Sequence, residues 1–148
     1  MYIISFMPSI RTTFEYHGAE HKTIACYEAL DELTVDNVKK HTRFHPRCGT
    51  SFIIIVLIIS IIVGIFLPRT NMWLRFGIQM LCLIPEASVA YELIKLAGRY
   101  DNFLTKIMSA PGIWLQHITT KEPNDKQIEC AIAALTPCLP KDMEDDKW

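Results

Sequence analysis

Histidine and glutamate residues near the start of the chain have the spacing of a metal-dependent hydrolase site. His17, Glu20 and His21 form the order H-x-x-E-H, which is the motif of inverted zinc peptidases. On a helix, residues four apart lie about 40° apart around the axis and about 6 Å apart along it, so both imidazoles can reach one ion. Glu20 would lie beside the ion, where it can take a proton from a bound water. The motif therefore predicts a zinc site with Glu20 as its general base.

Further ligand types follow in the same stretch. His45 and Cys48 are separated by two residues, and neutral imidazole and thiolate both suit zinc, so we predict them as a third and a fourth ligand. Glu28 is on the helical stripe of His21 but about 10 Å further along it, which excludes it from the same ion. His41 is as consistent with a surface histidine as with a ligand. The alternative to a metal site is a solvated helix face, because a five-residue motif is short.

The predicted site directly precedes the longest uncharged apolar segment. Residues 48–68 contain no charge, and a membrane span needs about 20 such residues, whereas a buried strand needs far fewer. We therefore predict a transmembrane helix. The basic residues before it are Lys39, Lys40, Arg43 and Arg47. By the positive-inside bias they place the histidine region in the cytoplasm of a cell-membrane protein, although Arg69 and Arg75 on the other side weaken that bias.

A second apolar segment, residues 73–97, predicts a helix that returns across the bilayer. It contains Glu86 near its middle and Glu92 near its predicted cytoplasmic end. A carboxylate at bilayer depth is costly unless it is paired, protonated or hydrated, so both residues are functional candidates. Glu92 is a candidate for a missing metal ligand. The alternative is that this helix lies partly outside the lipid, packed on a cytosolic domain.

Composition narrows the function classes further. The 148 residues carry a net charge of −1 and half of them are hydrophobic, which is ordinary for a small membrane protein and gives no basic excess for a nucleic-acid partner. The five cysteines are odd in number and include no CxxC pair, which argues against a disulfide framework.

The periodicity of the remaining segments predicts an all-α helical membrane protein. We expect helices over 17–33, 35–41 and 125–135, with Thr34 as the N-cap of the second. Residues 103–108 predict a short amphipathic segment, which a break at Pro111 and Gly112 separates from a membrane-interface segment over 113–118. The predicted division is a cytosolic His/Cys-rich region (1–50), a two-helix transmembrane hairpin (51–97), a cytosolic or interfacial helical region (98–140) and an acidic disordered tail (141–148).

Five sequence blocks in order resemble the bacterial DUF1385 family, whose members are described as predicted metal-dependent enzymes. The blocks are YHGAEHKTI, HPRCGTSF, YELIKLAG, PGIWLQHITTKEPND and IECAIAAL, and they extend from Tyr16 to Leu135. The resemblance implies a multi-pass membrane protein of unsettled substrate. Its signature cluster would be His17, Glu20, His21, His45 and Cys48. Motif members without an assigned role would be Glu92, Gln116 and Thr120.

The chain also departs from that family. Members usually carry a further N-terminal part with a glycine-rich GG-x-A-V-x-EGVMMR motif and more hydrophobic helices, which this sequence lacks. We expect a shortened or split member, or an internal start at Met1. Besides the lipid bilayer, the expected partners are a second chain that supplies the absent part, or further copies of this one. The stretch PEASVA differs from the family pattern, which makes Glu86 a feature of this protein.

Two functional classes fit these observations, with metal sensing or transport as a weaker third. The first is a membrane-associated metal-dependent hydrolase, in which His17 and His21 bind zinc and His45 or Cys48 completes the site. The second is a non-enzymatic membrane scaffold or assembly factor, in which a closed His/Cys site joins the helix to the following loop. Three protein ligands would leave room for water, and four would close the site.

Overall fold

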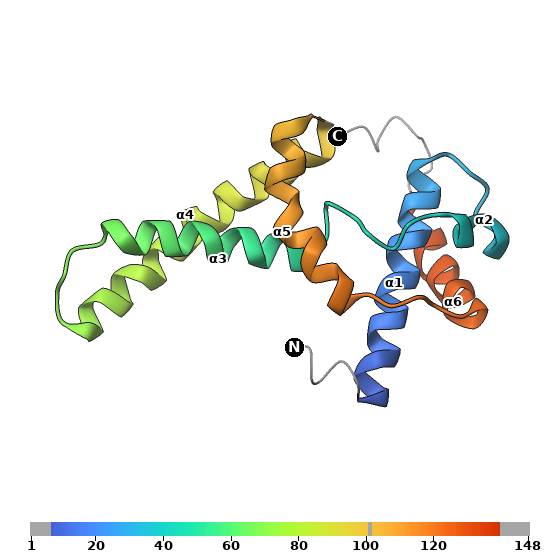
Figure 1. Ribbon diagram of the computed structural model, residues 1–148, viewed down its shortest axis with the longest axis horizontal. Helices are drawn as coiled ribbons and strands as arrows, with labels where there is room; N and C mark the ends of the chain where they lie inside the picture. Colours follow the sequence, from blue (N-terminus) through green and yellow to red (C-terminus); the bar gives the residue numbers. More distant parts are fainter. Residues whose placement is uncertain (1–6, 101, 140–148) are drawn as a thin grey trace. The chain divides into compact units, whose positions relative to one another are not determined.

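All the regular secondary structure among the described residues is helical, which confirms the all-α prediction. The computed structural model describes residues 7–100 and 102–139, except the side chain at position 104, and these residues form no strand. The helices are α1 (Pro8–Glu28), α2 (Val35–Lys40), α3 (Gly49–Phe66), α4 (Met72–Arg99), α5 (Phe103–Thr119), α6 (Asp125–Leu135) and the 3-10 helix η2 (Thr136–Cys138) (Figure 1). The predicted acidic tail, residues 141–148, lies outside the described residues.

The chain forms two compact units that do not follow the order of the sequence. We call residues 1–45 and 116–148 the histidine unit, and residues 46–115 the hairpin unit. The histidine unit is therefore built from both ends of the chain. The division into four segments that the sequence predicts remains a prediction. Within the histidine unit, α1 from the predicted segment 1–50 contacts α6 from the predicted segment 98–140.

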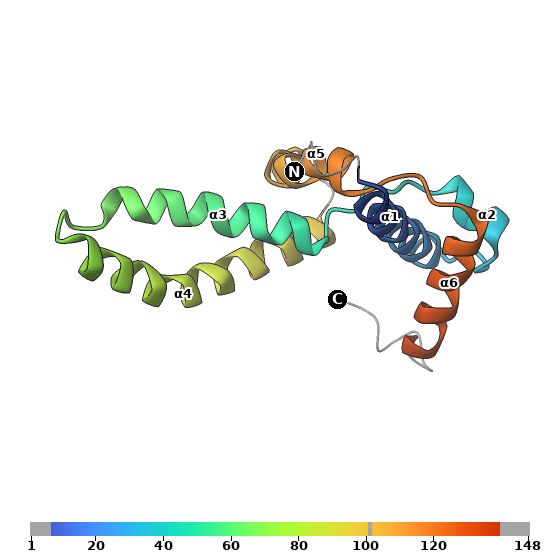
Figure 2. The ribbon, with the colours of Figure 1, turned by 90° about the horizontal axis from the view of Figure 1, so that it is seen from below.

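The histidine unit is held together by α1, which packs against α6 and α2 (Figures 1 and 2). Its fully buried core consists of Ala19, Cys26, Val38 and Ile128. The segment before α6 approaches α1 closely, because Lys121 N donates to Phe14 O at 2.8 Å. Gly18 permits this approach, since a Cβ there would collide with the carbonyl oxygen of Lys121. The end of α5 is thereby brought beside His17.

The bounds of α1 differ from those predicted. The helix begins at Pro8 rather than at residue 17, because a proline in the first turn lacks only an N–H that would have no helical partner there. It ends at Glu28 rather than at residue 33, and Leu30 beyond it has a φ of 60°, in the left-handed region that stops a helix. The N-cap predicted at Thr34 is confirmed, since its hydroxyl accepts from Asn37 N.

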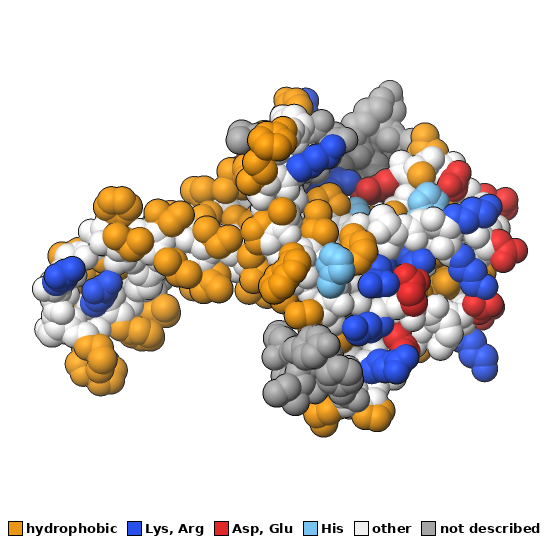
Figure 3. All heavy atoms as spheres, viewed as in Figure 1, with side chains coloured by type: hydrophobic (Ala, Val, Ile, Leu, Met, Phe, Trp, Pro, Cys, Tyr) orange, Lys and Arg blue, Asp and Glu red, His pale blue; other side chains and the backbone are white. Residues whose placement is uncertain are grey.

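The hairpin unit consists mainly of α3 and α4, which lie side by side in both ribbon views (Figures 1 and 2). Among the described residues, α3 is the one helix whose length and apolar composition suit a membrane span. The 28-residue α4 is less apolar, so the second crossing remains a prediction. On the face drawn in Figure 3, hydrophobic side chains cover most of the hairpin, with Lys and Arg side chains at its far end, whereas charged side chains of both signs gather over the histidine unit.

The carboxylate of Glu86 is buried between the two helices of the hairpin and is hydrogen-bonded there. Ser60 Oγ donates to Glu86 Oε2 at 2.7 Å, and Gln79 Nε2 donates to Glu86 Oε1 at 3.2 Å and to Ser60 Oγ at 2.8 Å. Only 4% of Glu86 is exposed. These donors satisfy a group that would otherwise be costly in an apolar environment.

The break predicted at Pro111 and Gly112 is wrong, because α5 is continuous from Phe103 to Thr119. A proline inside a helix removes one hydrogen bond, but tertiary packing can outweigh that loss. Gly112 lies so close to Ser51 of α3 that a Cβ would collide with the Ser51 side chain. Because glycine has no side chain, α5 can pack tightly against α3 at this position.

Candidate metal centre

His17 and His21 lie one helical turn apart on α1, and their rings are adjacent. Their ring centroids are 4.3 Å apart, with the planes inclined by 68°. His21 is 4% exposed, while His17 is half-buried. The i, i+4 spacing that the sequence offered therefore places two imidazoles within reach of one ion.

The hydrogen bonds of these rings define which nitrogen can bind a metal. His17 Nδ1 is 2.9 Å from the carbonyl oxygen of Thr119, and His21 Nδ1 is 2.7 Å from the carbonyl oxygen of Arg43. A carbonyl oxygen can only accept, so each Nδ1 carries a proton and donates it. In a neutral imidazole this leaves the lone pair on Nε2. Metal-binding histidines are oriented in this way.

The two accepting carbonyls are themselves fixed. The carbonyl of Thr119 is at the C-terminal end of α5, where helix carbonyls lack intrahelical donors. Arg43 is held by an ion pair to Glu122 at 2.9 Å, and Lys22 of α1 pairs with the other oxygen of Glu122, also at 2.9 Å. Partial burial raises the pKa of Glu122, but its hydrogen bonds to Lys22 and Arg43 and their charges outweigh burial and leave the pKa below its usual value.

His45 approaches the pair from the loop after α2. Its ring centroid is 5.9 Å from that of His21. The side-chain amide of Gln116 binds both backbone groups of His45. His45 N donates to Gln116 Oε1 at 2.8 Å, and Gln116 Nε2 donates to His45 O at 2.7 Å. His45 Nε2 lies 3.1 Å from Glu28 Oε2, so His45 would offer Nδ1 to a metal.

Sequence reasoning missed most of the residues that orient these rings. Gln116 was a motif member without a role, and in the structure its side chain binds the His45 backbone. Thr120 Oγ1 donates to the backbone carbonyl of Gln116 at 2.7 Å. Glu28 was excluded as a ligand to the His17/His21 ion, and it contacts His45 instead. The contributions of Thr119 and Arg43 are backbone carbonyls, which no residue type in the sequence reveals.

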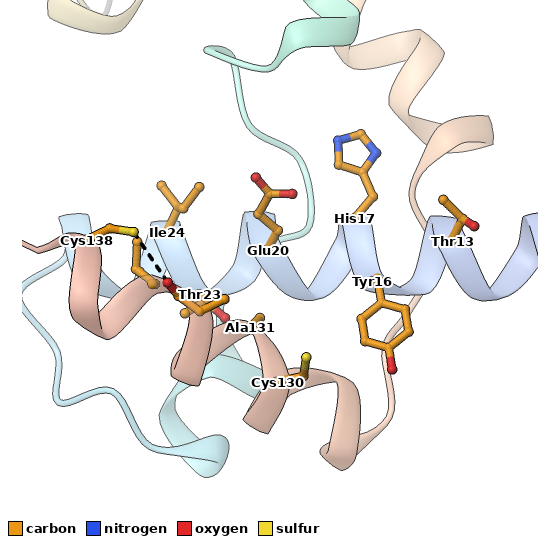
Figure 4. A pocket seen from close by; sticks show the side chains of 11 residues that line it. Thr13, Tyr16, His17, Glu20, Thr23, Ile24, Cys130, Ala131 and Cys138 are labelled. Atoms are coloured by element: carbon orange, nitrogen blue, oxygen red, sulfur yellow. Dashed lines mark hydrogen bonds between the residues drawn. The ribbon is translucent and has the colours of Figure 1, made fainter.

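Glu20 is exposed and lines a groove between α1 and α6. Figure 4 shows Glu20 and His17 on the same side of α1, while Tyr16 extends toward α6. The groove has a volume of about 540 Å³. Its walls include Thr13, Tyr16, His17, Glu20, Ile24, Cys130 and Leu135. Glu20 thus has access to water and to any molecule in the groove.

The remaining predicted site residues belong to other elements of the chain. Cys48 belongs to the hairpin unit, where it caps α3 by accepting from Thr50 N at 3.4 Å. Glu92 is exposed on α4 in the same unit. Their roles as ligands remain predictions. His41 ends α2, and its Nε2 is 2.9 Å from Asp31 Oδ2. Together with Cys26 these two residues form a group of side chains able to hold a metal ion.

Comparison with known proteins gives a family but no activity. The family model described as "Protein of unknown function (DUF1385)" matches residues 1–141. An "Uncharacterized protein YqhQ" from Bacillus subtilis (strain 168) is 40% identical over 141 residues, which are 94% of this chain and 44% of the relative. The chain therefore spans less than half the length of that relative. No solved structure matches.

Proposed function

This chain belongs to the DUF1385 family, which has no assigned activity, and we propose that it is a membrane-associated metal-dependent hydrolase. His17 and His21 bind the metal through Nε2, His45 or Cys48 supplies a further ligand, and Glu20 is the general base. The observation that carries the proposal is the pair of hydrogen bonds from His17 Nδ1 and His21 Nδ1 to backbone carbonyls. They present two adjacent Nε2 lone pairs, which is the arrangement that a bound ion requires.

The donor set fits zinc. Imidazole nitrogen and thiolate sulfur are ligands that Zn²⁺ prefers in proteins. Cys48 follows His45 by three residues, so the covalent chain keeps their Cα atoms within about 11 Å of each other. With three protein ligands a fourth position accepts water, and when bound there the ion lowers the pKa of that water to about 7.

Glu20 is suited to proton transfer by its position on α1. It lies three residues after His17 and one before His21, on the side of the helix that His17 also occupies (Figure 4). An exposed carboxylate there can take a proton from the attacking water and return it to the leaving group. The groove between α1 and α6 provides the space in which a substrate would lie against His17 and Glu20.

The membrane part of the proposal is supported by α3. It contains 18 residues with a mean hydropathy of 2.8, and only 11% of them are buried. Large apolar side chains such as Ile61, Ile65 and Phe66 are more than half exposed. An exposed apolar surface of this kind needs a nonaqueous partner, which a bilayer supplies. The basic residues before α3 favour a cytoplasmic histidine unit.

A structural metal site in a membrane scaffold is the second candidate. It is favoured by the environment of His45, whose backbone is held by Gln116 and whose ring contacts Glu28 of α1. If His45 and Cys48 both joined His17 and His21, four protein ligands would close the coordination shell. Glu20 would then have no catalytic role.

Metal analysis of the full-length protein in detergent separates the candidates. We expect the double variant His17→Ala/His21→Ala to lose one equivalent of zinc. Glu20→Gln should retain that zinc but hydrolyse chromogenic ester, phosphoester and peptide probes at least about 100-fold more slowly than the wild type. Glu129→Gln, an exposed glutamate on α6, is the matched control and should change neither.

Two results would overturn the hydrolase. If the His17→Ala/His21→Ala protein retained its full zinc content, these two histidines would not be zinc ligands. Zinc binding that depends on these histidines, without Glu20-dependent hydrolysis of any probe, would leave the structural site as the explanation.

A further inference from the structure

A second group of metal-ligating side chains lies at the turn between α1 and α2. Cys26 Sγ, a carboxylate oxygen of Asp31 and a ring nitrogen of His41 all lie within 4.8 Å of one another. All three residues belong to the histidine unit. The hydrolase proposal uses none of them.

The local fold explains why they meet. Cys26 is in the last turn of α1 and is fully buried. The left-handed conformation of Leu30 turns the chain back, so that Asp31 N donates to Cys26 O at 3.1 Å. His41 caps the C-terminus of α2, and its Nε2 is 2.9 Å from Asp31 Oδ2. Two helix ends and the connecting turn thus each contribute one ligand type.

We propose that Cys26, Asp31 and His41 form a second metal site, which takes Zn²⁺ or an ion of similar softness. A thiolate, an imidazole and a carboxylate are the three ligand classes found in protein zinc sites. The soft thiolate favours zinc over magnesium or calcium, which prefer oxygen ligands. Three protein ligands leave a fourth position for water or a small thiol.

The site has both an interior anchor and a path to solvent. Cys26 has no exposed surface, whereas the side chains of His41 and Asp31 are 19% and 53% exposed. The Cys26 thiol now points toward the carbonyls of Asp31 and Glu32, at 3.9 and 3.7 Å, which are long contacts. On binding, the Cys26 thiol loses its proton to solvent and the hydrogen bond between His41 Nε2 and Asp31 breaks. The imidazole proton is exchanged through solvent from Nε2 to Nδ1, and the thiolate sulfur, His41 Nε2 and a carboxylate oxygen of Asp31 then bind the ion.

Such an ion would hold the C-terminal end of α1 to α2. The opposing interpretation is that the His41–Asp31 contact alone secures the turn, with Cys26 as a buried apolar side chain. The two differ in one observable, because only a metal site produces a bond between Cys26 sulfur and the metal.

The test is Co²⁺ binding to the full-length protein in detergent, followed by the sulfur-to-cobalt charge-transfer absorption in the near ultraviolet. Cys48 is replaced by serine throughout, so that the first site cannot contribute this absorption. We expect the Cys48→Ser protein to show the absorption, Cys48→Ser/Cys26→Ser to lose it, and Cys48→Ser/Cys138→Ser to keep it. Cys138 is exposed and serves as the matched control.

A second variant distinguishes loss of the metal ligand from a folding defect caused by replacing the buried Cys26. His41→Ala in the Cys48→Ser protein leaves the thiol in place and should weaken Co²⁺ binding about tenfold or more, with an unchanged circular dichroism spectrum. Replacing His17 and His21 by alanine should leave the absorption intact. The experiment therefore tests the Cys26 site separately from the proposed hydrolase site. The proposal is overturned if the Cys48→Ser protein shows no charge-transfer absorption, or if the absorption survives Cys26→Ser.

Discussion

Individual side chains in the histidine unit are oriented largely by backbone carbonyls. His17 and His21 each donate Nδ1–H to a carbonyl, and the side-chain amide of Gln116 makes both backbone hydrogen bonds of His45. Two of these histidines therefore depend on groups more than 70 residues away, since His45 and Gln116 are separated by 71 positions and His17 and Thr119 by 102, whereas His21 and Arg43 are separated by 22.

Gln116→Ala is expected to destabilise the protein and weaken metal binding together. The amide is fully buried, and its removal leaves a buried N–H and C=O of His45 without these partners. The cost should be about 1–3 kcal/mol in the free energy of unfolding. Gln116→Glu keeps an acceptor for His45 N and should cost less. Equal stability of Gln116→Ala and wild type in urea denaturation would contradict this role.

Glu122 should give the histidine unit a pH-dependent stability. Its pKa is lowered in the folded protein, so its contribution is fully present above its ordinary pKa of 4.5 and is lost as the pH falls through the lowered value. Glu122→Gln should reduce stability at pH 7 by no more than about 1 kcal/mol, because the carboxylate is 62% exposed and screened. The difference from wild type should vanish in strong acid. A difference that persists there in thermal unfolding would rule out the ion pairs as its cause.

At the scale of helices, the sequence predicted what depends on local periodicity. Residues 125–135 form α6 as expected, and the Thr34 cap begins α2. The error at Pro111 arose because tight packing of Gly112 on Ser51 is a tertiary property. The H-x-x-E-H spacing indicated the His17/His21 pair, but nothing local could indicate that Gln116 and the carbonyl of Thr119 would orient the histidines.

Gly18→Ala tests the approach of the segment before α6 to α1. Alanine normally stabilises a helix interior by about 1 kcal/mol relative to glycine. At Gly18 the new Cβ meets the backbone carbonyl of Lys121, which cannot rotate away. We expect a net loss of about 1–3 kcal/mol and weaker zinc binding through displacement of Thr119. Gly77→Ala in α4, where nothing lies within 4 Å, is the control and should be neutral or stabilising. Similar melting temperatures for both variants would refute the close approach.

At the scale of the whole molecule, the apolar hairpin and the charged histidine unit have different solvent requirements. The proposed membrane location predicts that Ile61→Asp, at a position 59% exposed on α3, impairs insertion. The insertion cost of aspartate near the centre of a span is about 2.5–3.5 kcal/mol. Ile61→Leu is the control. The measurement is the fraction resistant to carbonate extraction from membranes, and an equal fraction for both variants would argue against α3 as a span.

The histidine unit is discontinuous in sequence, and this affects the order of biosynthesis. A ribosome makes His17 and His21 long before it makes Thr119, whose carbonyl orients His17, and the whole hairpin is translated in between. The nascent α1 therefore leaves the ribosome with a His17 imidazole that has not yet acquired its orienting acceptor. Maturation of the proposed metal centre would therefore wait until Thr119 has been synthesised, so ion uptake would be a late event in the life of each chain.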